Sequence, residues 1–254
     1  MELHLKSLIG MSQQKYFNVK LEFDKQKVDS IIEETIKKGE KGYVCSVEGN
    51  ILANTFSNPK YLAIINDSLV NICDGGSIAF FASIFHKKKF STYIGADMFL
   101  EYIEHKTYRY FFLGNTIEVL EGLKNNLNIL NPKLQHMSFE TLPFEKVENF
   151  NYQAIAQMVN LDNPDIIWVS LGAPKQEEFM NRLLPYLNRG VMFGFGAIFD
   201  FNAGVTKIKR APKIFLLLKL EWIYRLIKEP RKQGKRVSNI FKVYPQIILK
   251  ELRK

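Results

Sequence analysis

The chain has 254 residues, 46% of them hydrophobic and 24% charged, with a formal net charge of +9. These values are typical of a folded globular protein rather than a disordered one, and no run approaches the roughly 20 apolar residues of a membrane span. Two cysteines, Cys45 and Cys73, are too few for a disulfide scaffold or a structural zinc site, so we expect buried thiols and a reducing compartment.

Short apolar runs alternate with runs of helical pattern along most of the chain, which predicts βαβ units. The expected strands span residues 17–23, 43–47, 69–73, 108–113, 165–171 and 191–195, with a further extended segment within 134–139. The expected helices span residues 29–38, 59–67, 76–85, 97–104, 116–126, 152–159 and 174–187. The pattern therefore predicts the α/β class, with a Rossmann-like, mainly parallel sheet flanked by helices.

The pattern changes after about residue 204. Residues 205–254 hold 15 Lys or Arg and 3 Glu, a net charge of +12, whereas the other 204 residues carry a net charge of −3. Apolar residues recur there at helical spacing in two stretches that Glu229–Pro230 separates. We therefore expect an α/β domain over residues 1–204 and a basic amphipathic helical appendage over residues 205–254, which calls for an anionic partner.

Ligands of parallel sheets bind at the carboxyl ends of the strands, in the loops that lead into helices. The loops expected at that edge span residues 46–50, 74–76, 114–116, 172–176 and 194–197. Each loop follows an apolar run and holds small or polar residues, which is the arrangement that a nucleotide site needs. Gly194 and Gly196 lack the third glycine and the later acidic residue of a dinucleotide fingerprint, so we exclude NAD.

Asp74 directly follows one expected strand and precedes two glycines. A carboxylate at a strand end, beside backbone that lets a ligand approach closely, can serve as a general base. An aspartate that caps a helix gives the same pattern, so the spacing alone leaves both roles open.

The run SLGAPKQEEF is a second candidate. Gly172 permits a tight turn, Pro174 suits a first helical turn, and the N–H groups of the new helix would face a phosphate or a sugar hydroxyl. Gln176 would then point toward the same cleft as Asp74. An ordinary loop between a strand and a helix is the alternative.

The sequence predicts no metal site, because its four histidines are scattered and no D-x-D pair occurs. Fixed positive charge would then have to stabilise a departing diphosphate. Arg210, Arg225, Arg231 and Lys232 in the basic appendage are the candidates for this role, and a solvated basic face is the alternative for each of them.

Six runs, taken in order, resemble the successive blocks of the WecG/TagA/CpsF family, glycosyltransferase family 26. The match extends from about Tyr43 to Lys232, roughly three-quarters of the chain. The runs are ICDGGSIAF, TYIGADMF, FFLGNT, DIIWVSLGAPKQEEF, FGFGAIFDFNAGVTKIKRAP and LEWIYRLIKEPRK.

The resemblance implies an inverting transfer of a sugar from a UDP-sugar to a polyprenyl-diphosphate-linked sugar, without a divalent metal. Asp74 falls on the aspartate proposed as the family's catalytic base, Ser46 on a threonine, and Gln176 on the glutamine of the G-x-P-K-Q-E block. We take these three as the catalytic candidates. The appendage, in the family, helps to close the site over the donor diphosphate and contacts the membrane. The candidates for donor binding are Gly75, Gly114, Asn115, Gly172, Pro174, Lys175, Gly196, Arg210, Arg225 and Arg231.

Three departures from the family pattern leave the identity of the transferred sugar open. Glu48 stands where an asparagine is usual, and Thr92–Ile94 stand before Gly95 where arginine and valine are common; an H-G-Y-F-like segment is also missing near His136. UDP-N-acetylmannosamine is the first expectation for the donor, with its uronic acid or a neutral hexose such as glucose or galactose as alternatives. The product would belong to wall teichoic acid, capsule or another exopolysaccharide.

Two other functions remain as alternatives at this stage. The basic appendage could be a nucleic-acid-binding arm, but its apolar and aromatic helix faces argue against nucleic acid as a partner. The other alternative is a non-catalytic scaffold of a polysaccharide assembly complex. We expect a cytoplasmic protein bound peripherally to the anionic inner face of the plasma membrane, because the N-terminus has no secretory signal pattern. The sequence does not specify the oligomeric state, so a homo-oligomer stays open.

Overall fold

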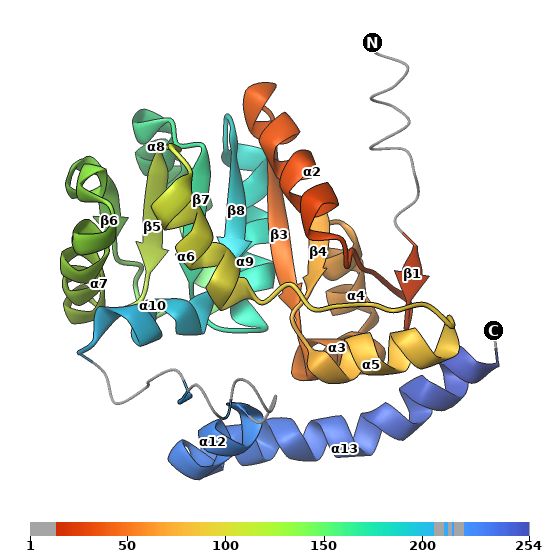
Figure 1. Cartoon of the computed structure of the whole chain (residues 1–254). Helices are drawn as coiled ribbons and strands as arrows, with labels where there is room; N and C mark the ends of the chain where they lie inside the picture. Colours follow the sequence, from red (N-terminus) through yellow and green to blue (C-terminus); the bar gives the residue numbers. More distant parts are fainter. Residues whose placement is uncertain (1–13, 206–210, 213–214, 216–220, 254) are drawn as a thin grey trace.

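A computed structural model of the chain describes residues 14–205, 211–212, 215 and 221–253 (Figure 1). Its centre is a six-stranded, all-parallel sheet with the order β4-β3-β8-β7-β5-β6. The strands are β3 (Lys41–Val47), β4 (Val70–Cys73), β5 (Tyr110–Gly114), β6 (Ser138–Glu140), β7 (Ile166–Ser170) and β8 (Gly190–Gly194). This arrangement confirms the predicted α/β fold.

Helices cover both faces of the sheet, because successive side chains of each strand point to opposite faces and both sets are apolar. One core cluster joins one set of strand side chains to α3 (Gly49–Ser57), α4 (Pro59–Asn66), α5 (Gly76–Phe85), α8 (Tyr152–Asp162) and α9 (Lys175–Leu183). The other cluster joins the alternate set to α2 (Lys25–Lys37), α6 (Gly95–His105), α7 (Ile117–Leu130) and α10 (Gly196–Ala203).

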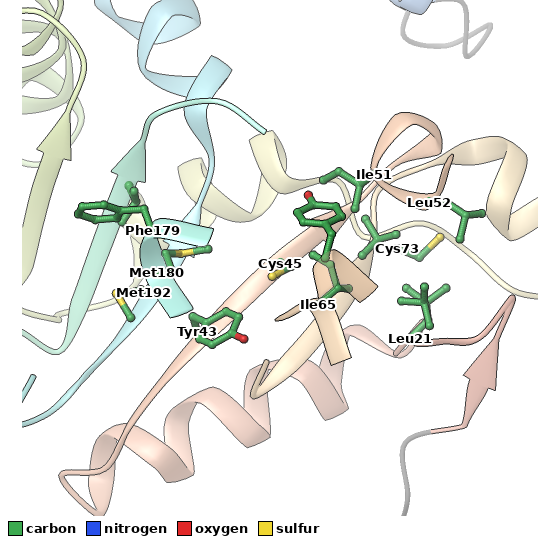
Figure 2. Close-up of a cluster of buried hydrophobic side chains, with 14 of the residues drawn as sticks. Leu21, Tyr43, Cys45, Ile51, Leu52, Ile65, Cys73, Phe179, Met180 and Met192 are labelled. Atoms are coloured by element: carbon green, nitrogen blue, oxygen red, sulfur yellow. The ribbon is translucent and has the colours of Figure 1, made fainter. Parts of the chain in front are cut away.

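Figure 2 shows part of the first cluster, in which Tyr43 and Cys45 of β3 lie among side chains from several helices. Both cysteines are free and buried, as expected. Burial raises the pKa of the Cys73 thiol to about 12 and that of Cys45 well above its ordinary value, so neither thiol ionises near neutral pH.

The sequence prediction was wrong at three places. Residues 17–23 form no single strand, because Phe17 and Asn18 take positive φ angles of 55° and 66° and turn the chain between β1 (Lys15–Tyr16) and β2 (Val19–Lys20). The expected loop 46–50 already contains the start of α3 at Gly49. The expected loop 194–197 likewise ends in α10, whose helical pattern we did not predict.

The C-terminal residues form α12 (Glu221–Lys228) and α13 (Pro230–Leu252), which confirms the predicted break at Glu229–Pro230. Helix α13 runs beneath α3 and α5 (Figure 1). Gly49 permits this packing, because a Cβ atom there would lie 3.0 Å from the hydroxyl of Tyr244. Short 3₁₀ turns span Pro132–His136, Val147–Asn149 and Leu184–Tyr186. Within the described part of the chain, no helix has the length and apolar character needed to cross a membrane.

Candidate active site

The carboxyl edge between β3 and β8 is where this topology places a ligand. Helix α3, which follows β3, packs on one face of the sheet, whereas α10, which follows β8, packs on the other face. The two connections therefore diverge from this edge, and open α/β sheets bind their ligands at such a point. In Figure 1 the arrowheads of β3, β5 and β8 point to this edge, beneath which α12 and α13 lie.

Asp74 lies at this edge, immediately after β4, and is partly exposed. Its carboxylate accepts a hydrogen bond of 2.7 Å from the hydroxyl of Ser46, at the end of β3. The backbone N–H of Gly95, at the start of α6, donates to the other carboxylate oxygen at 3.4 Å. Two segments that are distant in sequence thus reach the carboxylate of Asp74, and two of the three predicted catalytic residues are in direct contact.

Glycines bring backbone close to Asp74. A Cβ atom on Gly75 would lie 3.3 Å from the Cα atom of Glu48, and a Cβ atom on Gly95 would lie 3.3 Å from the hydroxyl of Ser46 and 3.2 Å from the ring of Phe195. Both contacts are tighter than a side chain normally permits. Gly75 and Gly95 are therefore packing requirements of the site.

Gln176, the third catalytic candidate, is buried at the start of α9 and holds two loops together. Its side-chain oxygen accepts from the backbone N–H groups of Gly172 and Gly196, both at 3.1 Å. Its side-chain nitrogen donates to the carbonyl of Gly194 at 2.7 Å and to Glu177 at 2.8 Å. An amide side chain can accept two hydrogen bonds and donate two, so all four positions are used within the protein.

Sequence reasoning missed Glu177, which is fully buried beside Gln176. Its second carboxylate oxygen accepts a hydrogen bond of 3.0 Å from the hydroxyl of Tyr61 on α4. Burial is the main cause that raises the pKa of Glu177 to about 7, and the hydrogen bonds from Gln176 and Tyr61 oppose it. The only sequence signal was a charged residue at a core-facing position of a helix.

A second polar cluster lies at the carboxyl ends of β5 and β7. The side chain of Asn115 donates to the hydroxyl of Ser170 at 3.0 Å and to Asp200 of α10 at 3.4 Å, while Ser170 donates to the carbonyl of Gly196 at 2.8 Å. Gly114 and Asn115 adopt positive φ angles of 98° and 68°, which favour these residue types. Asn115 was predicted; Ser170 and Asp200 were not.

Three further predicted donor-binding residues, Gly172, Pro174 and Lys175, lie in the loop before α9 and at its first residue. Gly172 has a positive φ of 76° and accepts a hydrogen bond from the backbone N–H of Gln176, so that helix N–H group is already occupied. Pro174 is exposed immediately before the helix. The ammonium group of Lys175 lies 4.9 Å from the ring centre of Phe150, a cation–π contact.

Glu48, one of the departures from the family pattern, acts as a helix cap. Its carboxylate accepts from the backbone N–H groups of Asn50 and Ile51 at 2.9 and 3.1 Å, at the start of α3. A side-chain acceptor at this position satisfies N–H groups that have no partner inside the helix.

A hollow at the opposite, amino edge of the sheet is less suited to this chemistry. It is lined by residues that include Lys106, Arg109 and His136. Two of these cations already engage carboxylates, since Lys106 lies 2.6 Å from Glu33 and Arg109 lies 2.6 Å from Asp162. We therefore place the site at the carboxyl edge, where Asp74 and the glycine-rich loops meet.

Comparison with known proteins shows which family the chain resembles. The model of the glycosyl transferase WecG/TagA/CpsF family matches residues 16–254. The chain belongs to this family. It is therefore a glycosyltransferase, and the resemblance seen in the six sequence runs is confirmed.

Several curated relatives carry the name N-acetylglucosaminyldiphosphoundecaprenol N-acetyl-beta-D-mannosaminyltransferase. The protein from Bacillus spizizenii is 27% identical over 213 residues, which cover 82% of this chain and 80% of that protein. The Bacillus subtilis protein is 26% identical over 82% of this chain and 79% of its own length. A Staphylococcus aureus protein is 26% identical over 76% of this chain and 74% of its own length.

The appendage of this glycosyltransferase brings one predicted arginine next to α10. The guanidinium of Arg225 lies 5.5 Å from the ring centre of Phe201, the residue after Asp200. The Nε atom of Arg225 is buried and has no hydrogen-bond partner among the described residues. Arg231, at the start of α13, is exposed, and Arg210 lies outside the described residues.

Over the part of the chain that the structure covers, no three His, Cys, Asp or Glu side chains are placed to hold a metal ion. The arrangement can supply one carboxylate at a strand end, a hydroxyl that orients it and an arginine beside α10. These groups fit proton transfer and the binding of a phosphate.

Proposed function

We propose that this chain transfers N-acetylmannosamine, with inversion, from its UDP-linked donor to a sugar on a polyprenyl diphosphate. The observation that carries this proposal is the position of Asp74, partly exposed at the sheet edge and oriented by Ser46 and Gly95. The relatives named above support the choice of sugar and acceptor, because their names state an N-acetylmannosaminyl transfer to N-acetylglucosaminyldiphosphoundecaprenol.

In this proposal Asp74 takes the proton from an acceptor hydroxyl as that oxygen bonds to the anomeric carbon of the donor. The bond between this carbon and the UDP oxygen breaks, and UDP leaves with the electron pair. Inversion requires one base on the face opposite the leaving group, so a single carboxylate suffices. Ser46 would keep that carboxylate in its reactive orientation.

The donor would extend along the edge from Asp74 toward the cluster of Asn115 and Asp200. Strands β4 and β5 are four positions apart in the sheet, which corresponds to about 19 Å at the usual spacing of strands. A nucleotide sugar is an extended ligand with its reactive carbon near one end. We place the nucleoside over β5 and β7 and the anomeric carbon near Asp74.

The basic appendage, residues 205–254, supplies positive charge in place of a metal ion. Arg225 and Arg231 would bind the diphosphate of UDP through charge-assisted hydrogen bonds. Interleaved basic and apolar residues also suit contact with an anionic lipid surface. We therefore propose that residues 1–204 form the catalytic domain and that the protein works in the cytoplasm at the inner face of a plasma membrane, in teichoic acid or another surface polysaccharide pathway.

A donor panel tests the proposal. The full chain would be mixed with an undecaprenyl-diphosphate-linked N-acetylglucosamine and, in turn, the UDP-linked forms of N-acetylmannosamine, its uronic acid, glucose and galactose, all with EDTA present. We expect a product one N-acetylmannosamine heavier by mass, and a parallel reaction without EDTA should form it at the same rate. Another sugar in the product would contradict the choice of donor, and the absence of UDP release from every donor would contradict catalysis.

A further inference from the structure

Helix α5 begins two residues after Asp74, and some of its apolar side chains are exposed at the surface. Ile78, Ala79 and Ala82 on its inner side are buried in the core, whereas Phe80 and Ile84 are 59% and 53% exposed. The last two residues are four positions apart, so they lie on the same side of the helix. Exposed apolar side chains that form a stripe mark a surface that contacts a ligand or partner.

Helix α13 lies next to this stripe. The hydroxyl groups of Ser77 on α5 and Tyr244 on α13 are 3.1 Å apart and hydrogen-bonded, and Figure 1 shows the two helices side by side. Phe241 and Leu252 of α13 are 71% and 61% exposed. They are about three helical turns apart, so they share one side of α13.

We propose that Phe80 and Ile84 bind the isoprenoid chain of the lipid acceptor, which would continue over Phe241 and Leu252 of the neighbouring α13. This inference rests on the proposed function, in which the acceptor sugar lies at Asp74. The ten residues of α5 span about 15 Å, so Phe80 and Ile84 lie about 6 and 12 Å along the helix from its start. That distance leaves room for the diphosphate between the reacting sugar and the first apolar contact.

The charges around α5 indicate where the lipid chain leads. Lys87, Lys88 and Lys89 follow the helix directly and are exposed. Anionic lipid head groups attract such lysines, so the end of α5 remote from Asp74 would face the membrane surface. The isoprenoid chain would then run from the active site along α5 and into the bilayer.

The test compares two acceptors that differ only in their lipid. One is N-acetylglucosamine diphosphate on a farnesyl chain, and the other carries the same head group on a butyl chain. In the full chain, the double variant Phe80→Ser, Ile84→Ser should bind the farnesyl acceptor about tenfold more weakly, because it loses apolar contact area. Binding of the butyl acceptor should not change. Both affinities can be measured by calorimetry and, for the transfer reaction, as KM.

A matched control replaces Ile129 and Leu161 by serine, since these residues are 80% and 89% exposed on α7 and α8. It should bind both acceptors like the wild type. Equal losses for the two acceptors, or no loss, would overturn the proposal. So would a loss of binding to acceptor-free anionic vesicles or a change of oligomeric state in the double variant, because the stripe would then contact bilayer lipid or a second copy. If the wild-type protein bound the farnesyl acceptor more tightly than the butyl acceptor but transferred no sugar, the proposed function would be contradicted and the lipid-binding surface would not.

Discussion

Asp74 and Gln176 lie at the same edge of one sheet, but their surroundings differ. Asp74 is partly exposed, and its carboxylate accepts hydrogen bonds from Ser46 and Gly95. Gln176 is only 5% exposed, and its amide makes four hydrogen bonds within the protein. A partly exposed carboxylate can exchange a proton with a substrate, whereas a saturated amide can only hold the groups that it contacts.

The comparison separates two tasks that the sequence motifs alone do not distinguish. The β3 and β4 side of the edge would supply the reactive group. The β7 and β8 side would supply rigidity, because Gln176 joins the loops that contain Gly172 and Gly196, and Glu177 joins α9 to Tyr61 on α4. Precise positioning of loops contributes to catalysis without contact with the substrate.

Asp74→Asn should produce the largest effect on turnover. The amide keeps the size of the carboxyl group but cannot accept the proton, so kcat should fall by about 10²–10⁴-fold. Thermal unfolding followed by circular dichroism should show a wild-type transition. Turnover near the wild-type level in a folded variant would show that Asp74 is not the base. The proposed division between a reactive side of the edge at β3 and β4 and a rigid side at β7 and β8 would then fail.

Gln176→Leu should lower the free energy of unfolding by about 3 kcal/mol or more. It leaves the N–H groups of Gly172 and Gly196, the carbonyl of Gly194 and the carboxyl of Glu177 without this partner, and each unpaired buried group costs about 1–3 kcal/mol. Denaturant titration would measure the loss.

Arg182→Ala is a control for that variant, because Arg182 lies on the same helix with an exposed side chain. It should change stability by about 0.5 kcal/mol or less. If Gln176→Leu kept wild-type stability and lost turnover, Gln176 would act on the substrate directly, and the separation of tasks would be wrong.

The parts of this molecule that sequence could predict are those with a local signal. The parallel strands are short apolar runs, and Asp74 was identified because it follows such a run directly. Helix α3 was missed because its start, Gly49–Asn50, resembles a turn, whereas the cap from Glu48 and the burial of its apolar side chains in the core favour a helix. Asp200 could not be paired with Asn115, since 85 residues separate them and only the packing of α10 joins them.

The buried carboxyl group of Glu177 should make the stability of the protein depend on pH. The folded protein keeps its carboxyl proton up to a pKa of about 7, whereas the unfolded chain loses that proton near 4.5. Between these values the folded state binds more protons, so its stability should fall as pH rises, by about 3 kcal/mol in total. Glu177→Gln cannot titrate.

Urea unfolding of both proteins from pH 4.5 to pH 8 would test this expectation. The stability of Glu177→Gln relative to the wild type should rise with pH across that window. A constant difference would show that folding does not raise the pKa of Glu177, in which case Gln176 contacts a charged carboxylate near neutral pH.

Ser46→Ala should have the smallest effect on turnover. The variant loses the 2.7 Å hydrogen bond that orients Asp74 but keeps the carboxylate, so kcat should fall by about tenfold, as expected for one hydrogen bond to a charged group. Ser46→Thr retains the hydroxyl and should restore most of the rate, and both rates can be measured by UDP release. A loss as large as that of Asp74→Asn would mean that Ser46 takes part in proton transfer itself. An unchanged rate would mean that the N–H group of Gly95 and the backbone of Asp74 are enough to keep the base in place. The β3 and β4 side of the edge would then be as rigid as the β7 and β8 side.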